Sequence, residues 1–303
     1  NQKRAPFVTD DDEVLVNAWV KVDADNRVTA IIPHSEMGQG AQTALTQMLA
    51  DEMDAAWEDV SFMEAPAEDG YANHLLGKGY LLGDAPIPSL LQGTVDGGML
   101  QIAKSMHLQI TGGSLSVRTT GVYGMRVAGA AARAMLTDAA AETWSVPARE
   151  IVAKDTHLLH EPSGYRVPFA AMAALAGERS PPTKPRLKTR ERFRIMGTSV
   201  PRLDLPPKVD GTAKFGIDAE LPGMKIATIR AAPVFGAKVA DLDDGKARAM
   251  PGVVDVVRLD DAVAVVADGY WQAKKALEAV RVSWTPTDAD GTDSEGILQG
   301  FRD

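Results

Sequence analysis

The sequence predicts an α+β fold built in two parts, and three observations support this prediction. Two β-branched apolar runs within residues 14–33 are separated by turn-forming residues, a pattern typical of a hairpin. Apolar residues at helical spacing and a later alanine-rich stretch predict helices over residues 43–54 and 127–145. A proline-rich stretch over residues 180–207 separates this part from a second group of predicted strands and helices.

Composition excludes several classes of protein. With 303 residues, 45% of them hydrophobic and 24% charged, the chain has an ordinary globular composition. The net charge of −9 argues against a general nucleic-acid binder or a protein attracted to anionic membranes. The sequence contains no cysteine, which excludes disulfides, thiolate zinc sites, cysteine-ligated iron–sulfur clusters and a thiol nucleophile from this chain.

No apolar run approaches the ~18 residues of a membrane span, so we expect no membrane insertion. The chain starts without an initiator Met, so we expect a trimmed protein.

The order of predicted elements divides the chain into five segments. In the first domain we also expect a strand over residues 60–65 and a long loop over residues 70–98, which are rich in glycine and proline. In the second domain we expect strands at 224–231, 252–259, 263–267 and 281–284, and helices near 243–250 and 270–279. The five segments are a flexible lead-in (1–14), the first domain (15–180), a proline-rich linker (181–206), the second domain (207–285) and a polar tail (286–303).

The first candidate binding segment is Met37, Gly38, Gln39 and Gly40, at the junction of a predicted strand and a predicted helix. Glycines at such a junction allow close backbone approach, and the amides at a helix N-terminus can hold an anion or a polar heterocycle. Taken alone, a glycine turn before a helix is more often structural. The carboxamide of Gln39 adds donors and an acceptor that suit the edge of a purine or a pterin.

A second glycine segment, TGGSLSVR, repeats this chemistry before the alanine-rich helix. Its amides and two hydroxyls could cradle a phosphate or a pterin. A serine hydrolase is the local competitor, but the nucleophile elbow G-x-S-x-G requires glycine where this chain has Ser116. The glycines of residues 77–83 miss the dinucleotide pattern, because the third glycine comes one position late.

Histidines and charged residues single out no catalytic set. Of the five histidines only His157 and His160 are close in sequence, and residues three apart on an extended segment point to opposite faces. We therefore expect no metal ligands and can name no acid–base pair from spacing. Arg126 and Arg133 could place cations near a phosphate, although an exposed helix face is the default position for such arginines.

Three stretches taken together carry a family resemblance. Residues 17–54, the segment TGGSLSVR followed by MRVAGAAARAML, and PPKVDGTAKFGIDAELPGM resemble the large subunit of molybdenum hydroxylases, the xanthine dehydrogenase and aldehyde oxidase family. The likeness is greatest to the isoquinoline 1-oxidoreductase β-subunit group, and it runs from about Asn17 to Trp284. In that family the two glycine segments are walls of the molybdopterin site. The positions that match them here are Met37, Gly38, Gln39 and Gly40 for the first wall and Gly113, Ser114, Leu115 and Ser116 for the second.

The resemblance also implies an architecture and partners. It identifies residues 15–180 as the first part of a molybdopterin-binding domain and residues 207–285 as an α/β hammerhead-like domain. It implies molybdenum held by molybdopterin, either plain or as the cytosine dinucleotide, with iron–sulfur clusters only on a small partner subunit. The family's later segments, including its glutamate base, are not found in this sequence. We therefore expect no catalytic residue in this chain, a complementary C-terminal large-subunit chain, and no activity without that chain.

The activity that the resemblance implies is hydroxylation of an N-heteroaromatic compound or oxidation of an aldehyde, with water as the oxygen source and a small molecule as substrate. The alternative is a metal-free binding or structural module that keeps the family fold, because residues 70–98 show little of the family's pattern. We also expect the protein to lie in a bacterial periplasm rather than in a cytoplasm.

Overall fold

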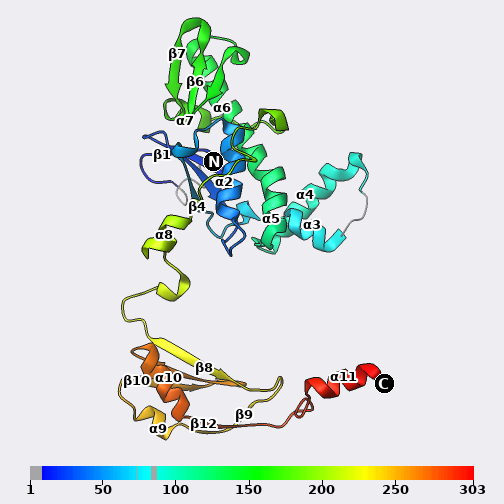
Figure 1. The fold of residues 1–303 in the computed structure, drawn as a ribbon, viewed down its shortest axis with the longest axis vertical. Coiled ribbons are helices and arrows are strands. Elements are labelled where there is room, and N and C mark those ends of the chain that lie inside the picture. Colours follow the sequence, from blue (N-terminus) through cyan, green and yellow to red (C-terminus); the bar gives the residue numbers. More distant parts are fainter. Residues whose placement is uncertain (1–8, 73, 83–86) are drawn as a thin grey trace. The chain divides into compact units, whose positions relative to one another are not determined.

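The computed structural model describes residues 9–72, 74–82 and 87–303, and it divides the chain into two compact units between Ala213 and Lys214 (Figure 1). Helices and strands occur in both units, which confirms the predicted α+β class. Residues 1–8 of the predicted lead-in lie outside the described residues, and the first strand begins within that segment, at Glu13.

The first unit is built on a four-stranded sheet in the order β1-β2-β3-β4. The predicted hairpin is present as β2 and β3, and β1 precedes it as a third antiparallel strand, while β4 pairs parallel to β3. The break between β1 and β2 was not predicted. It falls where the side-chain oxygen of Asn17 accepts a hydrogen bond from the Trp19 N–H (2.9 Å), which turns the chain. The strands are β1 (Glu13–Asn17), β2 (Val20–Asp23), β3 (Val28–Ile32) and β4 (Val60–Glu64).

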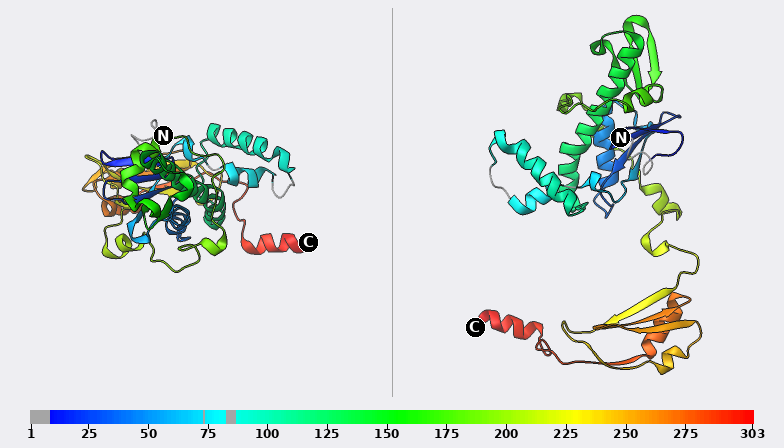
Figure 2. Two further views of the ribbon diagram at one scale, coloured as in Figure 1. Left: turned by 90° about the horizontal axis from the view of Figure 1, so that it is seen from above. Right: turned by 180° about the vertical axis from the view of Figure 1, so that it is seen from behind.

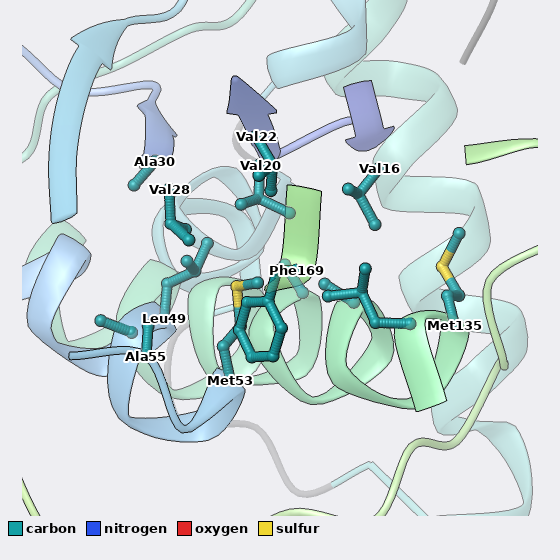
Figure 3. Packing of buried hydrophobic residues seen from close by; sticks show 14 of the residues in the cluster. Val16, Val20, Val22, Val28, Ala30, Leu49, Met53, Ala55, Met135 and Phe169 are labelled. Carbon is teal, nitrogen blue, oxygen red and sulfur yellow. The ribbon is translucent and has the colours of Figure 1, made fainter. Parts of the chain in front are cut away.

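Three helices form the hydrophobic core of this unit with the sheet: α2 (Ala41–Met53), α6 (Arg126–Trp144) and α7 (Phe169–Gly177). Alternate residues of the strands point toward them, and Figure 3 shows Val20 and Val22 facing Phe169 and Met53. Helices α2 and α6 approach so closely that a Cβ at Gly129 would lie 2.4 Å from the Leu49 carbonyl oxygen. Glycine is therefore required where these two backbones meet.

The remaining elements of the first unit surround this core. A π-helical turn at Gly121–Met125 joins α5 to α6, so that α5, the turn and α6 form one uninterrupted helical run. A three-stranded antiparallel sheet, in the order β5-β6-β7, leads into α7. The elements are α3 (His74–Leu82), α4 (Ser89–Ser105), α5 (Gly113–Thr120), β5 (Val152–Lys154), β6 (His157–His160), β7 (Tyr165–Pro168) and α8 (Leu205–Asp210).

Residues 70–98, predicted as a long loop, contain α3 and most of α4, which run side by side (Figure 2). The prediction of a loop was wrong because glycine was taken as a helix breaker. Each glycine inside a helix costs only about 1 kcal/mol relative to alanine. Met99 and Ala103, one turn apart on α4, are buried, and Lys78 of α3 pairs with Asp96 of α4 at 2.6 Å. These contacts offset that cost.

Residues 181–206, predicted as a linker between domains, lie within the first unit. The prolines keep the segment from forming a long helix, but its polar groups find partners on the C-terminal end of α2. The Lys188 ammonium donates to the carboxylates of Asp51 (2.9 Å) and Asp54 (2.7 Å), and the Lys188 N–H donates to Glu52 (3.0 Å). The Asp51 carboxylate also accepts the N–H groups of residues 194–196. An extended segment that satisfies buried carboxylates in this way packs as part of a domain.

Asp51 and Glu52 are completely buried in this cluster. Burial by itself raises the pKa of Asp51, but the hydrogen bonds from the Met196 N–H and from Lys188 outweigh burial and lower the pKa below its usual value. The carboxylate is therefore ionised in the folded protein and depends on its partners.

The second unit contains a three-stranded sheet in the order β10-β11-β8 and a separate antiparallel pair, β12 with β9. All the strands and helices predicted for residues 207–285 are present, and β9 is the one strand of this range that was missed. The predicted tail carries a further helix, α11, whose first turn is capped by the Asp293 side chain. The elements are β8 (Ile226–Ala231), β9 (Val239–Asp243), α9 (Gly245–Arg248), β10 (Val253–Arg258), β11 (Ala262–Ala267), α10 (Tyr270–Ala279), β12 (Arg281–Trp284) and α11 (Ser294–Arg302).

Within the described part of the chain, no helix combines the length and the apolar character needed to cross a bilayer.

Replacing Lys188 by Met tests the buried charge cluster. The substitution leaves Asp51 and Asp54 buried without their shared cation, so we expect the free energy of unfolding of the first unit to fall by about 3–5 kcal/mol. Urea denaturation followed by circular dichroism measures this change. Arg179→Met is the control, because Arg179 pairs with Glu142 at the surface, where an ion pair contributes at most about 1 kcal/mol. Equal losses in the two variants would contradict a special role for the cluster.

Candidate functional site

The turn between β3 and α2 contains the first predicted segment, and its backbone amides bind the side-chain carboxylate of Glu36, which lies in the same turn. Gly38 and Gly40 have φ angles of 99° and 77°, in the left-handed region that favours glycine. One oxygen of Glu36 accepts the N–H groups of Gly38 (2.8 Å) and Gly40 (2.9 Å). The side chain of Glu36 is only 6% exposed and lies 3.5 Å from the Arg202 guanidinium. A negative group already occupies the amides of this turn.

The side chain of Gln39 holds the turn from the other side. Its nitrogen donates to the Ser35 carbonyl (3.0 Å) and its oxygen accepts the Met37 N–H (2.7 Å). Each of these atoms can still make a second hydrogen bond, since a carboxamide has two donors and two lone pairs. The Met37 side chain is exposed. The turn therefore presents one neutral amide and one apolar side chain.

The second predicted segment begins α5. Gly113 has a φ of 57°, and neither a Cβ there nor one at Gly38 or Gly40 would meet an atom within 4 Å, so space is open at all three glycines. Among the described residues no side chain caps the first turn of α5. Ser114 is exposed, and Leu115 and Ser116 follow in the same turn, although their side chains lie outside the described part of the structure. The positive end of a helix dipole is therefore open to a ligand.

Two hydrogen bonds join residues that flank the two predicted segments. The Ser35 N–H donates to the Thr111 hydroxyl (2.9 Å), and the His34 Nε2 lies 2.7 Å from the Thr120 hydroxyl. The β3–α2 turn is thus joined to the chain just before α5 and to the last residue of α5. The sequence separates these partners by 76 and 86 residues.

His34 is buried, with 2% of its surface exposed. Burial lowers its pKa to about 4, against an opposing effect of the Ile110 backbone. The imidazole is therefore neutral near pH 7 and acts as a fixed hydrogen-bonding link rather than as a cation.

Arg126 and Arg133 neither face a phosphate nor lie on an exposed helix face. Arg126 donates from two nitrogens to one oxygen of the buried Glu52 (2.6 and 2.8 Å), and Arg133 donates to Asp54 (3.2 Å). Both guanidinium groups therefore pair with the acidic residues at the C-terminal end of α2, in the charge cluster that also binds residues 186–196.

The two neighbouring histidines lie on β6 and have separate partners. His160 is buried between Ser163 (2.7 Å) and Glu150 (3.3 Å), and His157 bonds to the Asp155 carbonyl. Across residues 9–72, 74–82 and 87–303 no group of three or more His, Asp or Glu side chains could hold a metal ion.

Four residues of this region were missed from the sequence: His34, Glu36, Thr111 and Thr120. A signal for Glu36 exists, because an acidic residue just before two glycines at a helix N-terminus is a natural acceptor for their amides. The other three have no local signal, since their contacts join distant parts of the chain.

Comparisons with known proteins show which proteins this chain resembles. Residues 4–75 match the family model of the molybdopterin cofactor-binding domain. The β-subunit of the isoquinoline 1-oxidoreductase of Brevundimonas diminuta is 31% identical over 96% of this chain and 38% of its own length. The membrane-bound aldehyde dehydrogenase (pyrroloquinoline-quinone) of Gluconacetobacter polyoxogenes is 29% identical over 94% and 34%, and a nicotinate dehydrogenase subunit of Pseudomonas putida is 26% identical over 94% and 22%.

The chain thus spans between about a fifth and two fifths of the length of these relatives. Among solved structures, a Cu,Mo-CO dehydrogenase aligns with 23% identity and a TM-score of 0.27, over 30% of this chain and 16% of its own. A reconstituted CO dehydrogenase from Oligotropha carboxidovorans gives 22% identity and a TM-score of 0.26, over 30% and 15%. Such TM-scores are too low to guide the description of the site.

Because His34 is buried and has a lowered pKa, we expect the free energy of unfolding of the first unit to depend on pH. Between pH 6.5, its usual pKa, and about pH 4, the unfolded chain binds a proton at this position that the folded chain does not. Stability should therefore fall as the pH drops through this range, by about 3 kcal/mol in total at this residue. Denaturant titrations between pH 4 and 7 measure the slope, and His34→Asn should reduce it. A His34 NMR titration midpoint near 6.5 would refute the prediction.

Proposed function

This chain belongs to the molybdenum hydroxylase family, and we propose that it forms the cofactor-binding portion of a molybdopterin-dependent oxidoreductase. One observation supports the assignment of the cofactor site to particular residues. Met37–Gly40 and Gly113–Ser116, the two segments that match the family's cofactor walls, follow residues joined by the Ser35–Thr111 hydrogen bond. A fold that brings two glycine-rich helix starts together, with open space at Gly38, Gly40 and Gly113, fits a flat polar cofactor.

The two segments suit different parts of such a cofactor. Glu36 already accepts the amides of Gly38 and Gly40, so a second anion would be repelled from the β3–α2 turn. The neutral carboxamide of Gln39 suits the edge of the pterin ring instead. Among the described side chains none caps the first turn of α5, and this turn suits the cofactor phosphate. We assign the ring to the β3–α2 turn and the phosphate to α5.

When bound, the molybdenum cofactor supplies oxidative chemistry in which an oxygen atom from water is added to the substrate and two electrons leave it. The role of this chain in that reaction is to bind and orient the cofactor. For the whole enzyme we propose hydroxylation of an N-heteroaromatic compound or oxidation of an aldehyde, which agrees with the activities for which the relatives are named.

Other parts of the reaction need residues outside this sequence. The 303 residues contain no cysteine, so cysteine-ligated iron–sulfur clusters would need cysteines outside this sequence, and we propose that a small partner subunit holds them. We propose that the general base and the substrate contacts come from the family's remaining length, on a complementary large-subunit chain. The cytosine dinucleotide form of the cofactor and a periplasmic location are part of the same proposal.

Metal and cofactor analysis of the native assembly tests the function. We expect molybdenum and a pterin to co-purify with this chain. The name of one relative includes pyrroloquinoline quinone, so a quinone stain should be run on the same sample. A well-folded assembly that contains quinone instead of molybdenum, or neither group, would refute the proposal, and the second result would favour a metal-free binding module.

Replacing Ser114 by Asp tests the phosphate assignment. A carboxylate in the first turn of α5 interacts favourably with the helix dipole, so the cofactor-free protein should keep its stability or gain about 0.3–1 kcal/mol. The same charge should repel a phosphate and weaken cofactor retention by about tenfold or more. Ser114→Asn is the neutral control of similar size. Equal molybdenum content after dialysis of the two variants would place the phosphate elsewhere.

A further inference from the structure

A cavity of about 360 Å³ lies in the first unit, outside both cofactor segments. Its walls come from the turn between β1 and β2, the end of β3, the start of α3, the π-helical turn with the beginning of α6, and Pro181 with Pro182. None of its described lining residues belongs to Met37–Gly40 or Gly113–Ser116. The size falls within the range of small-molecule sites in proteins.

The cavity walls are mainly aromatic and aliphatic. The rings of Trp19 and Tyr71 stand nearly perpendicular, with centroids 5.1 Å apart, and the Tyr123 side chain is exposed on the π-helical turn. The α6 side contributes the small side chains of Ala128 and Ala131. Perpendicular and offset ring pairs are the favoured arrangements between aromatic groups. A flat aromatic molecule would find a suitable surface here.

Polar groups in the walls are few and are largely engaged within the protein. The Tyr71 hydroxyl donates to the Ala18 carbonyl (2.9 Å), and the Asn17 carboxamide donates to the Ala128 carbonyl (2.9 Å). His34 is linked to Thr120, and burial lowers the pKa values of both His34 and His74, which keeps these imidazoles neutral. The described lining residues include no Asp, Glu, Lys or Arg. A charged ligand would lose its hydration here without gaining a counter-charge.

We propose that this cavity is a binding site for an uncharged aromatic molecule of one or two fused rings. The volume admits such a molecule, the aromatic walls contact its faces, and the neutral walls exclude its charged analogues. The described lining residues all belong to this chain and lie outside the two cofactor segments, so substitutions in the cavity leave those segments unchanged.

Indole is a suitable probe because it is aromatic, bicyclic and uncharged. Isothermal titration calorimetry of the native assembly should show saturable binding of one indole per copy of this chain, at the site that the variants below alter. Indole-3-carboxylate, which carries the same rings and a negative charge, should bind at least tenfold more weakly. The absence of saturable indole binding, or equal affinities for the two probes, would overturn the proposal.

Two variants connect the binding to this cavity. A Cβ at Gly124 would lie 3.5 Å from a Thr120 methyl carbon, an ordinary contact, so Gly124→Leu should fit the backbone and place its side chain in the cavity. It should abolish indole binding, whereas Gly98→Leu, on an open face of α4, should leave it unchanged. Tyr123→Ala removes an exposed ring without disturbing the core and should weaken binding several-fold. Undiminished binding by both cavity variants would also overturn the proposal.

Discussion

The structure of the first unit depends on the acidic end of α2. Asp51, Glu52 and Asp54 are held there by Lys188, Arg126 and Arg133, and by backbone amides of residues 194–196. Burying a carboxylate without partners would cost several kcal/mol, so residues 186–196 must lie against α2 for this helix to be buried at all. The same contacts fix α6, because both arginines belong to it. The charges therefore join α2, α6 and a distant proline-rich segment into one body.

That rigid pairing also sets the candidate site, since the two glycine segments lie at the N-termini of α2 and α5 and α5 continues into α6. The close backbone approach at Gly129 leaves no freedom to slide α6 along α2. His34 and Ser35 add the two hydrogen bonds that align the N-terminal ends. The placement of the two glycine turns thus depends on contacts made by residues outside the turns themselves.

Local patterns predicted much of this fold, and long-range contacts account for the failures. The hairpin, α2, α6 and almost every element of residues 214–285 follow from apolar periodicity and β-branched runs. Helices α3 and α4 were missed because their many glycines obscure the helical spacing of the apolar residues. Residues 181–206 were predicted to be a linker because their proline content does not reveal the contacts that they make with carboxylates far away in the sequence. At the site, the glycine segments were visible in the sequence. Glu36, which decides what those amides can bind, was overlooked, and Thr111 and Thr120 have partners 76 and 86 residues away.

The π-helical turn at Gly121–Met125 has a consequence for how this family can vary. An α-helix turns by about 100° per residue, so the number of residues between Gly113 and the core positions of α6 sets the direction in which the start of α5 points. Loss or gain of one residue there would rotate Gly113 and Ser114 away from the β3–α2 turn while leaving α6 packed. Insertions and deletions should therefore be tolerated in surface loops but excluded from this short stretch, where a Cβ at Gly121 would also lie only 2.3 Å from the Met48 sulfur.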